Sequence, residues 1–174
     1  MEMNILHMMQ GLRNPILDKI MVCITTLGDA GALWIILSLI LMPIKKYRKA
    51  GITMLVALVL SVLFGNVILK HLVARPRPCW VDKSVSMLVA IPKDFSFPSG
   101  HTSASFAAAA ALFFYYRKPG IAALSVALLI GISRLYLFVH YPTDVAAGMV
   151  FGIICAAISF FIVKKCTGMY MKQL

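Results

Sequence analysis

The sequence predicts an all-α, polytopic membrane protein with six transmembrane helices in one bundle. Of its 174 residues, 61% are hydrophobic and only 13% are charged, whereas soluble domains average about 45–50% apolar and about 25% charged residues. Several uncharged runs approach the roughly 20 residues that a membrane-spanning helix needs. This composition excludes a disordered chain and a soluble monomer. We expect residues 1–174 to form a single integral-membrane domain.

The net charge of +11 would indicate a nucleic-acid partner in a soluble protein. Here the basic residues lie between long apolar runs, so membrane orientation and anionic lipid explain them better. We therefore expect no nucleic-acid partner. The four cysteines form no CxxC pair, which argues against a zinc site or a disulfide framework.

The first two helices are expected over 14–28 and 31–45. Asn14 is a good N-cap and Pro15 suits the first helical position. The first of these helices reaches a spanning length only by including the charged residues Asp18 and Lys19. The sequence Gly28–Gly31 predicts a tight turn between the two helices.

Four more helices are expected over 50–70, 99–116, 120–138 and 143–163. The uncharged runs that support the third and sixth are 20 and 19 residues long, between Lys49 and Lys70 and between Asp144 and Lys164. The segment 71–98 is rich in proline and charge, and it is the only sizeable non-helical segment expected.

Basic residues predict the orientation. Those in the short loops on one side of the bundle are Lys45, Lys46, Arg48, Lys49, Arg117, Lys118, Lys164, Lys165 and Lys172. The positive-inside rule makes this side the cytoplasm, and an even helix count then puts both termini there. Six basic residues remain on the translocated side. The positive-inside rule does not account for them, whereas binding of an anionic ligand would.

Three polar clusters lie on that translocated side. The first runs from Lys70 to Arg77-Pro78. The second, Pro98-Ser99-Gly100-His101, opens an alanine-rich helix, and a helix N-terminus binds anions. The third joins Ser133-Arg134 to His140 and Asp144. A carboxylate on one nitrogen of an imidazole leaves the other nitrogen free as a nucleophile or base.

Taken singly, each cluster also fits a capped helix end or an interfacial charge. Taken together they offer three cations, a helix N-terminus, two histidines and a carboxylate on one side of a small bundle. The transition state of phosphoryl transfer needs positioned cations and N–H donors of this kind.

The three clusters together resemble the signature of the type 2 phosphatidic acid phosphatase superfamily, which also includes vanadium haloperoxidases. Lys-x6-Arg-Pro, Pro-Ser-Gly-His and Ser-Arg-x5-His-x3-Asp are all present, in order, between residues 70 and 144. The resemblance implies that His140 is the nucleophile and forms a phosphohistidine, that Asp144 holds its ring, and that His101 protonates the leaving group. It also implies that Lys70, Arg77, Ser99, Gly100 and Arg134 bind the phosphate, and that no metal or other cofactor takes part.

The expected function is therefore that of a membrane lipid phosphatase with its site at the extracytoplasmic face of the cytoplasmic membrane. Undecaprenyl pyrophosphate and phosphatidylglycerol phosphate are the leading substrates, with phosphatidic acid as a further candidate. Phosphotransfer to an alcohol and a non-catalytic lipid-binding or transport role remain as alternatives. Arg75, His71 and His7 lie outside the signature and are expected to be structural.

Overall fold

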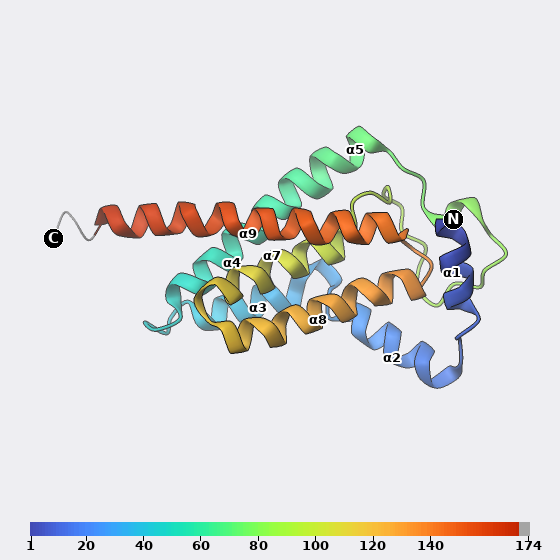
Figure 1. Ribbon diagram of the computed structural model, residues 1–174, viewed down its shortest axis with the longest axis horizontal. Helices are drawn as coiled ribbons and strands as arrows, with labels where there is room; N and C mark the ends of the chain where they lie inside the picture. The colour runs from blue at the N-terminus through green and yellow to red at the C-terminus, as the bar shows by residue number, and fades with distance from the viewer. Residues whose placement is uncertain (171–174) are drawn as a thin grey trace.

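The computed structural model describes residues 1–170 as a bundle of helices, with no β-strand among them (Figure 1). The α-helices are α1 (Glu2–Gln10), α2 (Pro15–Thr26), α3 (Ala32–Leu41), α4 (Arg48–Leu60), α5 (Lys70–Val73), α6 (Pro78–Val81), α7 (Gly100–Tyr115), α8 (Arg117–Tyr136) and α9 (Pro142–Tyr170). A short 3₁₀-helix, η1 (Asp29–Gly31), precedes α3, and a π-helical segment, η2 (Ser61–Leu69), joins α4 to α5.

Helix α7 forms the centre of the bundle, because its small side chains let its neighbours approach closely. Ala107, Ala108, Ala109 and Ala111 are fully buried between α4, α8 and α9. Helix α9 crosses so near that a Cβ on its Gly152 would lie 2.4 Å from the carbonyl oxygen of Ser103. The packing of α7 against α9 therefore fixes the Ser99–His101 segment relative to Asp144 in the first turn of α9.

The segment that joins α2 to α3 differs from the expected reversal. The predicted N-cap is present, since Asn14 Oδ1 accepts hydrogen bonds from the backbone N–H groups of Ile16 and Leu17. At the far end of α2, Ala30 and Gly31 have φ values of 50° and 67°, but the axes of the two helices are bent by only 43°. The chain therefore continues in broadly the same direction instead of turning back.

This bend changes the expected number of membrane crossings. By length and composition, three helical stretches of the described residues are able to span a membrane, namely 48–81, 117–136 and 142–167, and α2 with η1–α3 qualifies as a fourth, bent span. Helix α7 has 16 residues, or about 24 Å at 1.5 Å per residue. The two separate helices predicted over 14–28 and 31–45 are thus halves of one bent run.

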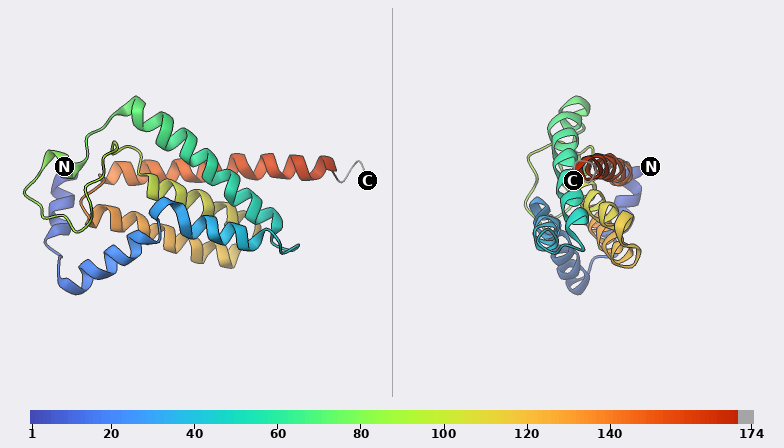
Figure 2. Two further views of the ribbon diagram at one scale, coloured as in Figure 1. Left: turned by 180° about the vertical axis from the view of Figure 1, so that it is seen from behind. Right: turned by 90° about the vertical axis from the view of Figure 1, so that its left-hand side faces the viewer.

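As a consequence, the two ends of the described chain lie at opposite ends of the bundle. Helix α1 lies at the end that holds the loops 74–99 and 137–141, whereas the last turns of α9 project from the other end (Figures 1 and 2). The expectation that both termini share one side therefore disagrees with the structure, because it depended on an even number of crossings.

Helix α1 is not among the helices expected from the sequence. This helix packs on the α8–α9 connection, where Leu6, Leu137, Phe138 and Val139 are almost fully buried. Gln10 Nε2 also donates a hydrogen bond of 2.8 Å to the carbonyl oxygen of Tyr136. The start of the chain is therefore part of the fold at this end of the bundle.

Candidate active site

The structure gathers the predicted residues around a cavity of about 800 Å³ near the α1 end of the bundle. The predicted residues that line it are Lys70, Arg77, Gly100, His101, Arg134 and His140. Asp144 and Ser99 are fully buried and lie outside the lining. The Ser99 hydroxyl is hydrogen-bonded to Thr102 Oγ1, in the first turn of α7, at 2.9 Å. It therefore does not line the cavity in this structure.

His140 follows α8 in the connection to α9, and its two ring nitrogens have different surroundings. Nδ1 lies 3.6 Å from Asp144 Oδ2 and 3.4 Å from Ser96 Oγ. Nε2 lies 3.0 Å from Arg77 Nη1, which can only donate. These contacts assign the ring proton to Nδ1 and leave a lone pair on Nε2 toward the cavity.

The surroundings of His140 favour the neutral form of its ring. Burial lowers its pKa below the ordinary histidine value, and the positive charges of Arg77 and Arg134 lower it further, against the opposing effect of Asp144. A neutral imidazole with its lone pair on Nε2 is the form that attacks an electrophile.

Arg77 has no N–H donor to spare. Its Nε donates to the backbone oxygen of Asp94, and Nη2 donates to Asp94 Oδ1 at 2.7 Å and to the backbone oxygen of Phe95 at 3.3 Å. Its Nη1 donates to the Val139 carbonyl at 2.8 Å and to His140 Nε2. A guanidinium carries five N–H donors, so a phosphate that binds here must displace one of these acceptors.

Asp94 is a site residue that the sequence analysis did not find. Its carboxylate is ion-paired with both Lys70 and Arg77, and it lines the cavity with 56% of its side chain exposed. Partial burial opposes its ionisation, but the hydrogen bond from Lys70 and the charges of Arg77 and Lys70 lower the pKa of Asp94 to about 2. The carboxylate is therefore charged at neutral pH and offsets one of the two positive charges that it contacts.

Arg134 is the third cation of the site, and within the described residues it forms no ion pair. Its Nη1 donates to Thr25 Oγ1 at 2.6 Å, while its Nε is buried without a hydrogen-bond partner. A buried donor of this kind costs free energy unless a ligand satisfies it. The cavity thus retains an uncompensated positive charge that favours an anion.

His101 also has a carboxylate partner that the sequence did not reveal. Its Nε2 lies 2.8 Å from Asp29 Oδ1, and Asp29 begins the bend between α2 and α3. The left-handed backbone of Ala30 and Gly31 turns this bend toward α7, where a Cβ on Gly28 would lie 2.8 Å from the His101 ring. Strained backbone of this kind is typical of functional sites.

The cavity continues from these polar groups along an apolar wall. Its apolar lining comes from the facing helices α3, α4 and η2, and includes Ile35, Leu55, Leu58, Val59, Val62 and Leu63. An anionic group among the cations would therefore have an apolar track beside it, as a lipid with a charged head requires.

The PAP2 superfamily profile matches residues 50–167, which is more than half of the chain. The chain belongs to the PAP2 superfamily. The resemblance drawn from the three motifs is confirmed by this match.

Three similar proteins extend the comparison to PAP2 lipid phosphatases. The chain is 36% identical over 151 residues to undecaprenyl-diphosphatase BcrC of Bacillus subtilis, covering 84% of this chain and 75% of that protein. The crystal structure of Aquifex aeolicus LpxE superimposes with a TM-score of 0.79 at 29% identity, over 91% of this chain and 93% of LpxE. The structure of a PAP2-type phosphatidylglycerolphosphate phosphatase from Bacillus subtilis gives a TM-score of 0.72 at 30% identity, over 95% and 83%.

Proposed function

We propose that this protein hydrolyses a lipid phosphate or diphosphate through a phosphohistidine on His140, with undecaprenyl diphosphate as the first candidate substrate. The observation that carries the proposal is the geometry of His140, which lines a cavity with three cations, with Nδ1 3.6 Å from Asp144 Oδ2 and Nε2 beside Arg77. The similarity to undecaprenyl-diphosphatase BcrC supports the choice of substrate. Residues 1–174 would act as one integral-membrane phosphatase domain.

Substrate binding would begin with an exchange of acceptors on the cations. The phosphate oxygens would take the place of Asp94 on Lys70 and Arg77, and they would satisfy the unpartnered Nε of Arg134. They would also take the Arg77 N–H that now occupies His140 Nε2, which frees the nucleophilic lone pair as the phosphorus arrives. The backbone N–H of Gly100 at the start of α7 would add a donor.

In the chemical step, His140 Nε2 would attack phosphorus and the bond to the leaving oxygen of the lipid would break. His101 would give its proton to that oxygen, and Asp144 would stabilise the positive charge that develops on the His140 ring. Water, deprotonated by His101, would then cleave the N–P bond and release inorganic phosphate. Ser99 would join the phosphate ligands only after its hydroxyl turned away from Thr102.

In the membrane, the site would face the extracytoplasmic side of the cytoplasmic membrane. The basic residues around the α3–α4 connection and at the start of α8, together with the basic end of α9, support this orientation through the positive-inside rule. The bent α2–α3 run would then count as one crossing, with α4–α5, α7, α8 and α9 as the others, which puts α1 on the extracytoplasmic side.

The test is phosphate release by the purified protein from a panel of undecaprenyl diphosphate, phosphatidylglycerol phosphate, phosphatidic acid and a water-soluble monoester. Release from a lipid, abolished in the His140→Ala variant and inhibited by vanadate, is the expected result. EDTA is expected to leave the rate unchanged, because the proposed chemistry uses only protein side chains. Absence of release in every condition would refute the hydrolase proposal, and transfer to an added alcohol would replace it with phosphotransfer.

A further inference from the structure

Arg75, which the sequence analysis treated as structural, contacts the carboxylate of the proposed catalytic pair. Its Nη1 donates to Asp144 Oδ1 at 2.6 Å and to Thr143 Oγ1 at 2.7 Å. Its guanidinium also lies over the ring of Tyr141, 3.9 Å from the centroid. Two hydrogen bonds and a stacked ring fix the plane of this guanidinium next to a carboxylate that has no exposed surface.

The hydrogen bonds of Asp144 show what this contact does. Oδ2 accepts from Ser96 Oγ and from the backbone N–H of Tyr141 at 2.9 Å, and it faces His140 Nδ1. Oδ1 is bound by Arg75. A carboxylate held at both oxygens cannot rotate, so Oδ2 stays directed at the imidazole.

The second N–H edge of Arg75 extends the network to the start of the chain. Arg75 Nη2 donates to Glu2 Oε2 at 2.6 Å. The other carboxylate oxygen of Glu2 accepts from the backbone N–H of Thr143 at 3.0 Å and from its hydroxyl at 2.7 Å. Glu2 thus binds both Arg75 and the first turn of α9, the turn that carries Asp144.

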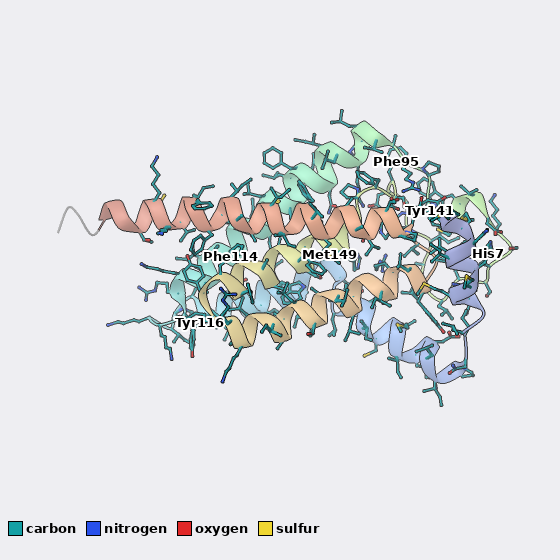
Figure 3. The ribbon with its side chains drawn as sticks, viewed as in Figure 1. His7, Phe95, Phe114, Tyr116, Tyr141 and Met149 are labelled. Carbon is teal, nitrogen blue, oxygen red and sulfur yellow. The ribbon has the colours of Figure 1, made fainter. Side chains whose placement is uncertain are left out.

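Helix α1 is packed firmly enough to hold Glu2 in this position. Leu6 is fully buried against the α8–α9 connection, and His7 Nε2 pairs with Asp82 at 3.1 Å. Figure 3 shows His7 on α1 beside the end of the bundle where Tyr141 lies. The contact between α1 and the site is therefore built by packing as well as by charge.

We propose that Arg75 and Glu2 are positioning residues that hold the Asp144 carboxylate in register with His140. This inference rests on the proposed function, because it assigns His140 as the nucleophile. Arg75 would orient Asp144 and balance its buried negative charge, and Glu2 would hold Arg75 and the start of α9 together. The other charged groups near the pair are Arg77 and Arg134, which lie on the phosphate side of His140.

The test compares variants of the full-length protein in detergent with undecaprenyl diphosphate as substrate. Arg75→Ala is expected to lower kcat about 100-fold with KM within about threefold, since a small misplacement of a catalytic group costs this much. Arg75→Lys, which offers a single ammonium in place of the planar fork, should recover part of the rate. Glu2→Gln is expected to lower kcat about fivefold, because Arg75 keeps its bond to Asp144. In the pH profile, the acidic limb of Arg75→Ala should move to higher pH.

Met8→Ala is the matched control, since it shortens an exposed side chain of α1 and leaves Glu2 in place; its rate should equal that of the unchanged protein. The double variant Arg75→Ala/Asp144→Asn should be no slower than Asp144→Asn alone, because the two residues act as one unit. A raised KM with unchanged kcat in Arg75→Ala would assign Arg75 to phosphate binding and overturn the proposal. Additive losses in the double variant would overturn it as well, and Arg75→Lys supplies the same comparison where Arg75→Ala does not fold. An inactive unmodified protein would instead refute the proposed function.

Discussion

The two ends of the bundle carry similar numbers of basic residues but very different numbers of acidic ones. At the end opposite the site, where Figure 3 labels Phe114 and Tyr116, the basic residues are Lys45, Lys46, Arg48, Lys49, Arg117, Lys118, Lys164 and Lys165. At the site end they are Arg13, Lys19, Lys70, Arg75, Arg77, Lys83, Lys93 and Arg134. All six acidic residues, Glu2, Asp18, Asp29, Asp82, Asp94 and Asp144, lie at the site end.

Charge therefore has a different role at each end of the bundle. Exposed cations without acidic neighbours, such as those of the α3–α4 loop, are hydrated, and by the positive-inside rule they are expected to orient the chain in the membrane. At the site end, carboxylates are paired with Lys70, Arg77 and Arg75, and for the deeply buried Lys70 and Arg77 an unpaired charge would be costly. Among the described residues Arg134 has no ion pair, which fits its proposed role as a ligand of the substrate phosphate.

The largest effect is expected from removing the proposed nucleophile at the site end. His140→Ala is expected to reduce phosphate release by about 10⁴-fold or more, because alanine leaves no group that can take the place of the proposed nucleophile. Lys118→Ala, at the opposite end, is the control and should leave the rate unchanged. A residual rate above about 1% of the unmodified protein would contradict the assignment of the nucleophile.

Asp29 tests whether the bend between α2 and α3 serves the chemistry. Asp29→Asn removes the charge that holds His101 and favours its protonated form, so kcat should fall about 10- to 100-fold, as for a disturbed general acid. Asp82→Asn is the control, because Asp82 lies at the same end but outside the cavity, and this variant should keep the kcat of the unmodified protein. An unchanged kcat in Asp29→Asn would mean that His101 is oriented by other contacts.

Asp94 tests whether a carboxylate at the site end competes with the substrate phosphate for Lys70 and Arg77. Asp94→Asn is expected to bind vanadate and phosphate about tenfold more tightly, since the anion no longer displaces a carboxylate from Lys70 and Arg77. Weaker anion binding in this variant would instead show that Asp94 organises the cations.

The same carboxylate predicts a dependence of stability on acid. Because the pKa of Asp94 is lowered to about 2, its ion pairs contribute stability above the ordinary aspartate pKa, and this contribution is lost as the pH falls toward 2. Thermal unfolding in detergent should therefore show a smaller acid-induced loss of stability in Asp94→Asn than in the unmodified protein.

The smallest effect is expected at the opposite end. Replacement of Lys45 and Lys46 by alanine should change phosphate release by less than about twofold, but it should increase the fraction of chains inserted in reverse. The exposed Cys166 on α9 reports this fraction through an impermeant thiol reagent added to intact cells, in a Cys23→Ala background. If the rate of phosphate release fell as much as the fraction of correctly oriented chains, the basic residues at this end would affect the activity as well as the orientation.

The sequence alone predicted a helical membrane protein, and six of its eight predicted site residues line the cavity. Each motif is local: Lys70 and Arg77 flank one helix end, His101 opens α7, and His140 lies four residues before Asp144. Uncharged runs and caps predicted α4, α7, α8 and the start of α9 within a few residues, because backbone satisfaction in lipid leaves few alternatives to a helix.

The partners of these residues depended on tertiary structure. His101 and Asp29 are 72 positions apart, Glu2 and Thr143 are 141 apart, and no local pattern connects such pairs. The direction of α3 was also undetermined, since Gly28–Gly31 permits either a reversal or the 43° bend that is present. The sequence by itself indicated the groups that are expected to bind phosphate, the pairing of His140 with Asp144, and the stretches that form α7, α8 and α9. Helix packing decided the remaining partners, Asp29 for His101 and Asp94 for the two cations, because a buried charge takes the partner that the folded chain brings within reach.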